Sequence, residues 1–468
     1  MSTTFDTQFD QRLIRKTFFR VLPVLCFLVF MGYLDRISVA YAGPSGMNAD
    51  LALTATTFGL IGGVFTIGYV FFAIPGALAM NRLGARRWMT TIAITWGSLQ
   101  TISALMPNFW ALLVVRVLIG VAEASLIPVA YAHAANWFPN RYRPLALGIV
   151  TACIGSAGIF GPMLATALMQ SATSLPIAEW RFMMLVLGLV AVVAGLFWYR
   201  YAADAPATAS WLDNDERVRL SEWLASDHQE LPEPGGAAAR VLRDWRSWTA
   251  GLCYFCLVYV AITMAIWAPT IVDDFSTQFD TEFNPYVAAA LVGTPALCTL
   301  VVQISMGAAV GRFGRPARLM VLGTVIGAAG CLLATVAGSP VTMMLSICIA
   351  ASASTGVVPA LLATVPRIFA GANTVMAFTV MDIVGASAGL VGPFLTGFFM
   401  DLTGNNDAAF YFMAGFSLLG GVFGVVLTRA ATQHEKLFPA TESKTAPSLS
   451  VAVTSAPDVS IPAVRMTD

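Results

Sequence analysis

The sequence has few charged residues. Only 11% of its 468 residues are Asp, Glu, Lys or Arg, whereas soluble proteins contain about 25%. The 26 basic and 26 acidic residues cancel, so no bulk positive charge attracts a nucleic acid, and we expect no nucleic-acid partner. Because 57% of the residues are hydrophobic, the chain has more apolar surface than a water-soluble fold can bury. The composition therefore predicts a membrane protein.

Residues that commonly carry enzyme or metal chemistry are also scarce. The three histidines are scattered, and the seven cysteines lie in apolar runs, where a thiol behaves as a small hydrophobic group. No loop is long enough to form a separate catalytic domain. These shortages argue against a membrane-embedded enzyme. We expect no catalytic residues, no metal site and no cofactor.

The chain instead contains about twelve apolar stretches, each long enough, at roughly 20 residues, to cross a bilayer. The first follows a basic segment without the pattern of a cleavable signal peptide, so we expect it to be retained as a spanning helix. The approximate centres of the stretches are Phe30, Gly68, Trp96, Gly120, Gly155, Val190, Val260, Leu297, Ala328, Ser352, Ala386 and Leu418.

Two short motifs occur twice. Residues 156–164 and 387–395 share the pattern Ser-Ala-Gly-x-x-Gly-Pro-x-Leu at a separation of 231 residues. Arg-Leu-Gly at 82–84 and Arg-Phe-Gly at 312–314 are 230 residues apart. A hydrophobic chain that repeats at half its length is typical of secondary transporters built from parallel repeats, with the substrate bound between the halves.

These features divide the chain into five segments. We predict an all-α membrane protein with twelve transmembrane helices in two six-helix bundles, at residues 21–200 and 247–429. A cytoplasmic linker, 201–246, joins the bundles. The terminal segments are 1–20 and a tail, 430–468, whose Ser, Thr, Ala and Pro content predicts disorder. Lys and Arg cluster in the amino terminus, the linker and alternate loops, so the positive-inside rule predicts both termini in the cytoplasm.

Five ionisable side chains fall within the predicted spans, where a charge is costly and marks a candidate functional site: Asp35, Arg36, Arg116, Glu123 and Asp382. Arg36 stays charged at any physiological pH and can hold a carboxylate through two hydrogen bonds. Asp35 and Glu123 are candidate proton sites. In the plainer alternative, the first four only neutralise each other between helices. For Asp382, a structural hydrogen bond and a proton-coupling role are both open.

Three aromatic side chains complete the candidate binding residues. Tyr33 and Tyr69 place hydroxyl groups at a similar depth to the charged residues. Trp267, on the seventh stretch, is either a substrate contact on the wall of a central cavity or a packing residue.

The repeated loop motif supplies candidate gating or structural residues. Arg82 and Gly84 lie between the second and third stretches, where the tight turn needs glycine. Arg312 and Gly314 repeat this arrangement in the second half. We assign Arg116 to the same structural group because it lies nearer to a helix end.

The resemblance to a known family rests on five segments: Tyr33-Leu34-Asp35-Arg36, Gly76 through Arg87, Arg116-x-x-x-Gly120-x-x-Glu123-Ala124, Trp137-Phe138-Pro139 and Trp180-Arg181. Through them the chain resembles the major facilitator superfamily and, more narrowly, its anion:cation symporter branch, over nearly its whole length. Residues 48–51 and 84–88 look closest to the tartrate, 4-hydroxyphenylacetate and sugar-acid permease group.

The resemblance implies a proton symporter for small organic anions in the bacterial inner membrane. It implies that Asp35 and Glu123 bind protons, and that Arg36, with Tyr33 and Tyr69, contacts the anion.

The chain departs from the family pattern in three places that bear on function. Asn81 stands where the loop motif usually has Asp. Asp382 stands where many relatives have Asn, and Ala386 where others have an anion-contacting Asn. This exchange of an amide for a carboxylate leaves the substrate and the number of coupled protons open.

We therefore predict a monomeric carrier that imports a carboxylate with protons by alternating access. An anion exchanger, an uncoupled carrier, a proton-driven drug exporter and a non-transporting sensor are alternatives. A drug exporter would favour an apolar cavity, so Arg36 argues against it.

Overall fold

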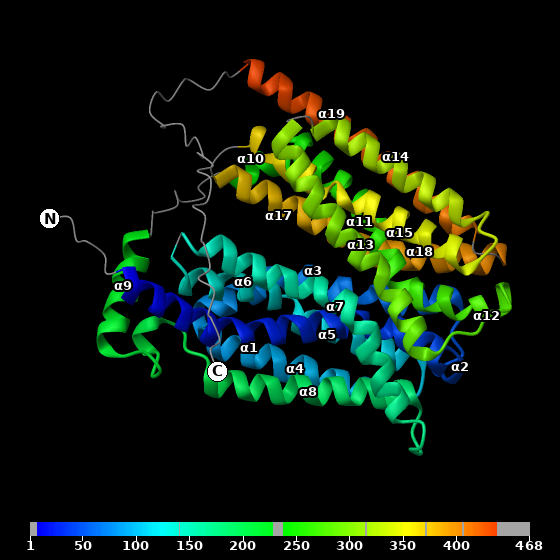
Figure 1. Ribbon diagram of the computed structural model, residues 1–468, viewed down its shortest axis with the longest axis horizontal. Helices are drawn as coiled ribbons and strands as arrows, with labels where there is room; N and C mark the ends of the chain where they lie inside the picture. The colour runs from blue at the N-terminus through cyan, green and yellow to red at the C-terminus, as the bar shows by residue number, and fades with distance from the viewer. Residues whose placement is uncertain are drawn as a thin grey trace, which may run out of the picture.

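The computed structural model describes residues 7–139, 141–227, 237–313, 316–369, 372–404 and 407–437. Within these ranges the chain is helical and contains no β-strand. Figure 1 shows two bundles, one formed by the amino-terminal half in blue to green and the other by the carboxy-terminal half in green to orange. The predicted all-helical fold with two repeated halves is confirmed.

The first bundle contains the helices of the first half of the chain. Its helices are α1 (Thr7–Ala42), η1 (Gly43–Met47), α2 (Asn48–Asp50), α3 (Ala55–Leu83), α4 (Ala85–Ser103), α5 (Phe109–Glu123), α6 (Leu126–Trp137), α7 (Arg143–Ser171) and α8 (Glu179–Tyr201). Polar caps define several of the starts. Thr54 accepts a hydrogen bond from Thr57 N at the start of α3, and Asn108 accepts one from Ala111 N at the start of α5.

The linker contains η2 (Pro206–Thr208), α9 (Asn214–Asp227) and α10 (Ala237–Arg243). Two ion pairs attach α9 to α1. Lys16 Nζ lies 2.6 Å from Glu216 Oε2, and Arg219 binds both oxygens of Asp10 at 3.0 and 2.9 Å. The first turns of α1 are therefore held against the linker helix α9. Residues 228–236 of the predicted linker lie outside the described residues.

The second bundle repeats the plan of the first. Its helices are α11 (Trp245–Asp273), α12 (Phe275–Gln278), α13 (Pro285–Phe313), α14 (Pro316–Ala334), α15 (Pro340–Gly356), α16 (Val358–Thr364), η3 (Val365–Arg367), α17 (Ala372–Ala386), α18 (Ala388–Thr403) and α19 (Asp407–Leu437). The last helix continues past residue 429, where the sequence predicted its end. The rest of the predicted tail, 438–468, lies outside the described residues.

Eleven helical segments of the described chain are long and apolar enough to cross a membrane. The remaining predicted span corresponds to α4, which contains Arg86, Arg87 and Gln100 and so has a lower hydropathy. This helix packs mainly against α8 and α5. The chain is therefore a multi-pass membrane protein.

Glycine residues at matching positions bring the two halves together. A Cβ on Gly63 of α3 would lie 2.7 Å from the carbonyl oxygen of Gly389, at the start of α18. A Cβ on Gly293 of α13 would lie 2.7 Å from the carbonyl oxygen of Ile159, on α7. Gly63 and Gly293 are 230 residues apart. Each repeated Ser-Ala-Gly block therefore packs against the second long helix of the opposite half, and only glycine allows so close an approach.

The halves are joined further at the end that carries α2 and α12. Asp401, at the end of α18, accepts hydrogen bonds from Ala55 N at 3.1 Å, Thr56 N at 2.8 Å and Thr56 Oγ1 at 2.5 Å. Its carboxylate thus caps the amino terminus of α3, where the helix leaves backbone N–H groups free. Toward the end with α9 and α10, the ribbons of the two bundles diverge (Figure 1).

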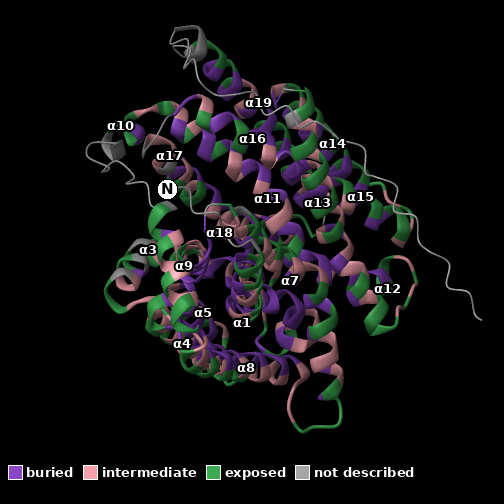
Figure 2. Ribbon diagram, turned by 60° about the vertical axis from the view of Figure 1, so that its left-hand side comes forward, coloured by how far each residue is buried: buried purple, intermediate pink, exposed green. Residues whose placement is uncertain are grey.

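Burial follows this arrangement. Figure 2 shows buried residues concentrated around the central helices, including α1, and exposed residues around the rim of the molecule. Large apolar side chains such as Leu189, Val193 and Phe197 of α8 are exposed on the outside. This is the distribution expected when the solvent of the outer surface is lipid.

Candidate functional site

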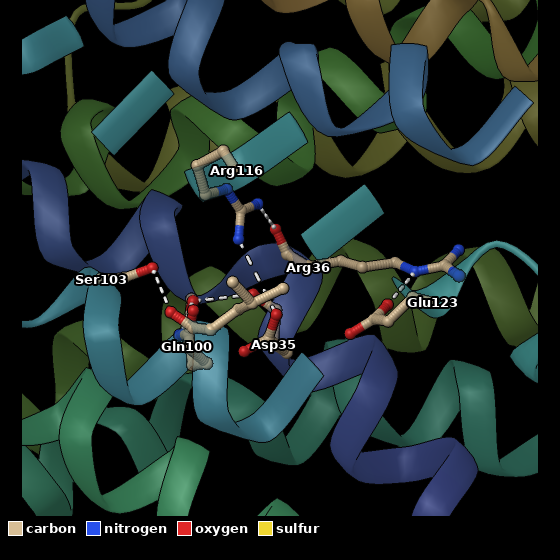
Figure 3. A network of polar contacts seen from close by, with 8 residues as sticks. Asp35, Arg36, Gln100, Ser103, Arg116 and Glu123 are labelled. Atoms are coloured by element: carbon tan, nitrogen blue, oxygen red, sulfur yellow. Dashed lines mark hydrogen bonds and ion pairs between the residues drawn. The ribbon is translucent and has the colours of Figure 1, made fainter. Parts of the chain in front are cut away.

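The charged side chains predicted on the first and fourth spans meet between α1 and α5 (Figure 3). Arg36 Nε donates a hydrogen bond to Glu123 Oε2 at 3.0 Å. The neighbouring pair is looser, because Arg116 Nη1 and Asp35 Oδ2 are 3.8 Å apart. Arg116 Nη2 also donates to the backbone carbonyl of Arg36 at 3.2 Å. Two ion pairs therefore link α1 to α5.

Three of these four side chains are removed from solvent. Asp35 is 2% exposed, Arg116 and Glu123 are 0% exposed, and Arg36 is half-buried. Neither oxygen of Asp35 accepts a hydrogen bond from the described residues, and Glu123 Oε1 is also unpartnered there. An ionised carboxylate is costly to bury without full hydrogen bonding. Both carboxyl groups are therefore chemically suited to hold a proton.

Arg36 lies against two aromatic rings of α3. Its Cζ atom is 4.9 Å from the ring centroid of Phe65 and 4.6 Å from that of Tyr69, within the range of cation–π attraction. Glu123 occupies Nε, while Nη2 is buried without a partner in the described part of the chain. The terminal edge of the guanidinium is therefore available to a second carboxylate.

Phe65 and Tyr69 reach Arg36 because α3 and α5 pack closely. A Cβ at Gly120 of α5 would collide with the backbone carbonyl of Phe65. The glycine of the Arg-x-x-x-Gly-x-x-Glu motif thus lets the two backbones touch. The same motif supplies both charged residues of α5 and the close helix contact that positions the aromatic wall.

Two buried polar side chains, Gln100 on α4 and Ser38 on α1, form a hydrogen-bond chain to the backbone of Asp35. Gln100 Nε2 donates to Ser38 Oγ at 3.1 Å, and Ser38 Oγ donates to the backbone carbonyl of Asp35 at 2.7 Å. Both side chains are buried. They fix the α1 backbone beside the ion pairs without contacting the carboxylate itself.

Asp382 reaches the region from the opposite half, on α17. It is exposed, and the described residues give it no ion pair or hydrogen bond. Its carboxylate lies close enough to interact electrostatically with Arg36, Tyr69 and Tyr254. The structure therefore gives no support to the structural hydrogen bond considered for it.

The remaining aromatic candidates differ in their surroundings. Tyr33 is half-buried on α1, one turn before Arg36, and interacts with it electrostatically. Trp267 is only 3% exposed and meets Phe58 edge to face at a ring-centroid distance of 5.1 Å, between α11 and α3. Trp267 thus packs between the halves, and its predicted contact with substrate stays a prediction.

The glycine of the first loop motif is required by its backbone. Gly84 has φ +82°, a conformation that favours glycine, and a Cβ there would lie 2.9 Å from Asp204 Oδ1. Asp204 accepts from Arg86 N at 2.7 Å, and Arg86 Nε donates to Tyr199 O at 2.6 Å. The loop is thus fastened to the end of α8. Arg82 is exposed.

In the second loop motif, Arg312 is exposed and lies near the ring of Phe313, with Cζ 5.8 Å from the centroid. Gly314 lies outside the described residues. The gating roles assigned to these loops stay predictions.

Four contributors to this arrangement escaped the sequence analysis. Phe65 precedes Tyr69 by one helical turn, and Gln100 is an isolated amide in an apolar stretch, so both left a weak signal. Asp204 and Asp401 left none, because each acts on backbone groups of a segment far away in sequence.

The site as a whole is short of positive charge. When ionised, Asp35, Glu123 and Asp382 carry three negative charges against two on Arg36 and Arg116. A bare anion would add to that imbalance, whereas an anion with a proton, or with its own positive group, would not. No group of three or more metal-ligating side chains occurs in the described ranges.

A family model described as Major Facilitator Superfamily matches residues 25–292 and 250–459. The "Putative tartrate transporter" of Agrobacterium vitis is 27% identical over 429 residues, covering 92% of this chain and 98% of its own. The "Quinolone resistance transporter" of Acinetobacter baumannii is 28% identical over 430 residues, covering 90% and 95%. The "Inner membrane transport protein RhmT" of Escherichia coli (strain K12) is 26% identical over 431 residues, covering 90% and 97%.

Solved structures share the fold. A bacterial homolog of the human lysosomal transporter Spinster, in an inward-facing and unoccupied conformation, has a TM-score of 0.70 at 16% identity and covers 90% of this chain and 97% of its own. The nucleoside transporter NupG has a TM-score of 0.62 at 14% identity, covering 88% and 99%. At these identities the likeness concerns the fold alone.

Proposed function

The chain belongs to the Major Facilitator Superfamily, and we propose that it is a secondary active transporter that imports a small organic anion by proton symport. It is a membrane transporter and not an enzyme. The anion is a carboxylate such as a sugar acid, tartrate or an aromatic acid. The name of the Agrobacterium vitis relative supports this substrate class.

The free edge of Arg36 carries the proposal. Arg36 uses Nε on Glu123 and leaves Nη2 unpartnered within the described chain. A substrate carboxylate bound to the terminal nitrogens places a second negative group on one guanidinium. Tyr69, whose ring centroid is 4.6 Å from Arg36 Cζ, forms the adjacent wall, and Tyr33 lies one turn before Arg36 on α1.

The coupling follows from charge repulsion in a buried place. Glu123 and the substrate carboxylate repel each other when both are ionised on Arg36, and Glu123 is fully buried. A proton on Glu123 removes the repulsion. Asp35 forms only a 3.8 Å contact with Arg116 and is a second proton position. Binding the anion and binding protons therefore favour each other.

The movement that completes transport is alternating access of the two halves. The glycine crossings at Gly63 and Gly293 are the contacts about which the halves rock, and the Asp401 cap on α3 is the latch of one end. The candidate gating residues of the opposite end are those of the two loop motifs: Arg82 with Gly84, and Arg312 with Gly314. We place both termini in the cytoplasm and the protein in the inner membrane, as a monomer, with the end that carries α2 and α12 outside.

Uptake by purified protein in liposomes tests this function. A labelled panel of glucuronate, tartrate, 4-hydroxyphenylacetate and phthalate is offered with and without an inward proton gradient. We expect one or more acids to accumulate only with the gradient. Flux that ignores the gradient would remove the proton roles of Asp35 and Glu123. Absence of flux for every acid, with or without an amine group, would reject organic-anion transport.

A second candidate is proton-driven export. The relative from Acinetobacter baumannii, named for quinolone resistance, favours it. The same liposomes distinguish the two directions, because an exporter would expel a preloaded quinolone when the external pH is lowered. We expect no such efflux, since the proposed coupling loads the proton and the anion together, so that an inward proton gradient drives the anion inward.

A further inference from the structure

Asp382 shares a helix face with the residues that touch α3. Gly389 follows it by seven residues, or two helical turns, which places both on one side of the α17–α18 stretch. A Cβ on Gly389 would lie 2.7 Å from Thr66 Oγ1 of α3. Asp382 therefore faces the side from which α3 presents Tyr69, three residues beyond Thr66.

A second aromatic ring lies on the same side of α17. A Cβ on Gly385, one turn after Asp382, would collide with the Tyr254 ring of α11. Electrostatic interactions connect Asp382 with Tyr254, Tyr69 and Arg36. Asp382 thus lies within electrostatic range of the guanidinium and of both aromatic rings.

Asp382 has no protein cation of its own. The described residues give it no ion pair, although an ionisable group at membrane depth normally has a partner. Arg36 is paired with Glu123 at 3.0 Å. With Arg116 beside Asp35, each arginine of the site already has a carboxylate partner, and the charge of Asp382 remains without a counter-ion in the described residues.

We propose that the carried molecule is zwitterionic, with its carboxylate on Arg36 and a protonated amine directed to Asp382 between the rings of Tyr69 and Tyr254. An alkylammonium group is attracted both by a carboxylate and by the faces of nearby aromatic rings. Such a substrate is neutral overall and supplies the positive charge that the site lacks. This inference rests on the proposed function, since it names the class of acid carried.

Matched acids that differ only by an amine test the inference. The full-length protein in liposomes is assayed by uptake of each labelled acid under the inward proton gradient and by competition between the two members of each pair. The pairs are 4-(aminomethyl)benzoate with 4-methylbenzoate, tyrosine with 3-(4-hydroxyphenyl)propionate, and 4-aminobutyrate with butyrate. In at least one pair, we expect the amine-bearing acid to compete at about tenfold lower concentration, as desolvated charge pairs allow.

Variants of Asp382 identify the group responsible. In Asp382→Asn the preference for the amine should vanish while competition by the amine-free acid persists. Asp382→Glu, which keeps the negative charge, should retain part of the preference and controls for a folding defect.

The contrary outcomes are distinct. Gradient-driven uptake of acids without any preference for the amine would overturn this inference and leave the proposed function intact. A preference that survives in Asp382→Asn would also overturn it. If no acid of either kind is transported or competes, the proposed function fails, and the zwitterionic substrate fails with it.

Discussion

The two halves of the molecule share a fold and differ in their interiors. In the first half, Arg36 with Glu123 and Arg116 with Asp35 form ion pairs between α1 and α5. In the second half, the residue 231 positions after Glu123 is Ser354. Its hydroxyl lies 2.9 Å from that of Ser417, which donates to the carbonyl of Thr324 at 2.9 Å.

The same separation leads from Arg116 to Ile347, a fully buried apolar residue. The two halves therefore share the helix plan and the glycine crossings, whereas within the described residues the charged centre lies in the first half alone. The second half contributes one unpaired carboxylate, Asp382, from across the interface. We infer that the proton chemistry lies in the first half, while the second half contributes Asp382 to substrate binding.

Removing Arg116 should have the largest effect. In Arg116→Leu, Asp35 keeps its burial and loses its ion partner, so we expect a loss of about 3–5 kcal/mol of stability. Thermal unfolding in detergent measures it. The control, Ile347→Leu in the other half, should cost less than about 1.5 kcal/mol.

The double variant Asp35→Asn with Arg116→Leu should regain most of the lost stability, because the unpaired charge is gone. A single Arg116→Leu variant as stable as the parent protein would show that the buried pair does not hold α1 to α5.

Neutralising Arg36 should have the next largest effect, on uptake rather than on folding. Arg36→Gln removes the half-buried guanidinium whose Nη2 has no partner in the described residues, so we expect initial uptake to fall about 100-fold. Arg219→Gln is the matched control, since it removes an arginine ion pair on the linker helix α9. Equal uptake by the two variants would contradict substrate binding at Arg36.

The sequence predicted the halves, the repeat and the charged residues of α1 and α5, because local patterns record all of them. It did not predict the contact of Asp401 with Thr56 or the placement of Phe65 against Arg36. Both depend on how distant helices pack. Trp267 shows the same limit, since its helix face alone did not indicate that Phe58 covers it.

The latch between α18 and α3 should have a smaller effect. Asp401→Ala removes a helix cap worth about 1–2 kcal/mol, which should shift the balance between closed and open states of this end by about tenfold. Gln170→Ala, 231 positions earlier, is the matched control in the first half.

Double electron–electron resonance measures whether the Asp401 cap holds this end of the two halves together. Spin labels at Leu53 and at Leu402, which is 67% exposed, would be placed in a variant lacking the seven native cysteines. We expect a larger share of long distances in Asp401→Ala. An unchanged distribution would mean that the cap does not hold this end closed.

The smallest effect should come from the hydrogen-bonded hydroxyl groups of Ser354 and Ser417 in the second half. Ser354→Ala breaks one buried hydrogen bond, worth about 1 kcal/mol. Gradient-driven uptake should stay within about twofold of the parent protein, because no charge or proton site is lost. A loss of proton coupling in this variant would show that the second half takes part in the chemistry.

The most direct test compares two modes of transport in Glu123→Gln. Liposomes containing this variant are assayed for accumulation of the identified acid under an inward proton gradient and for counterflow exchange without a gradient. The glutamine keeps the shape of the side chain and cannot take up a proton. We predict that accumulation is lost while counterflow persists. Accumulation of the acid under the gradient by Glu123→Gln would contradict the coupling of proton and anion at the Arg36–Glu123 pair.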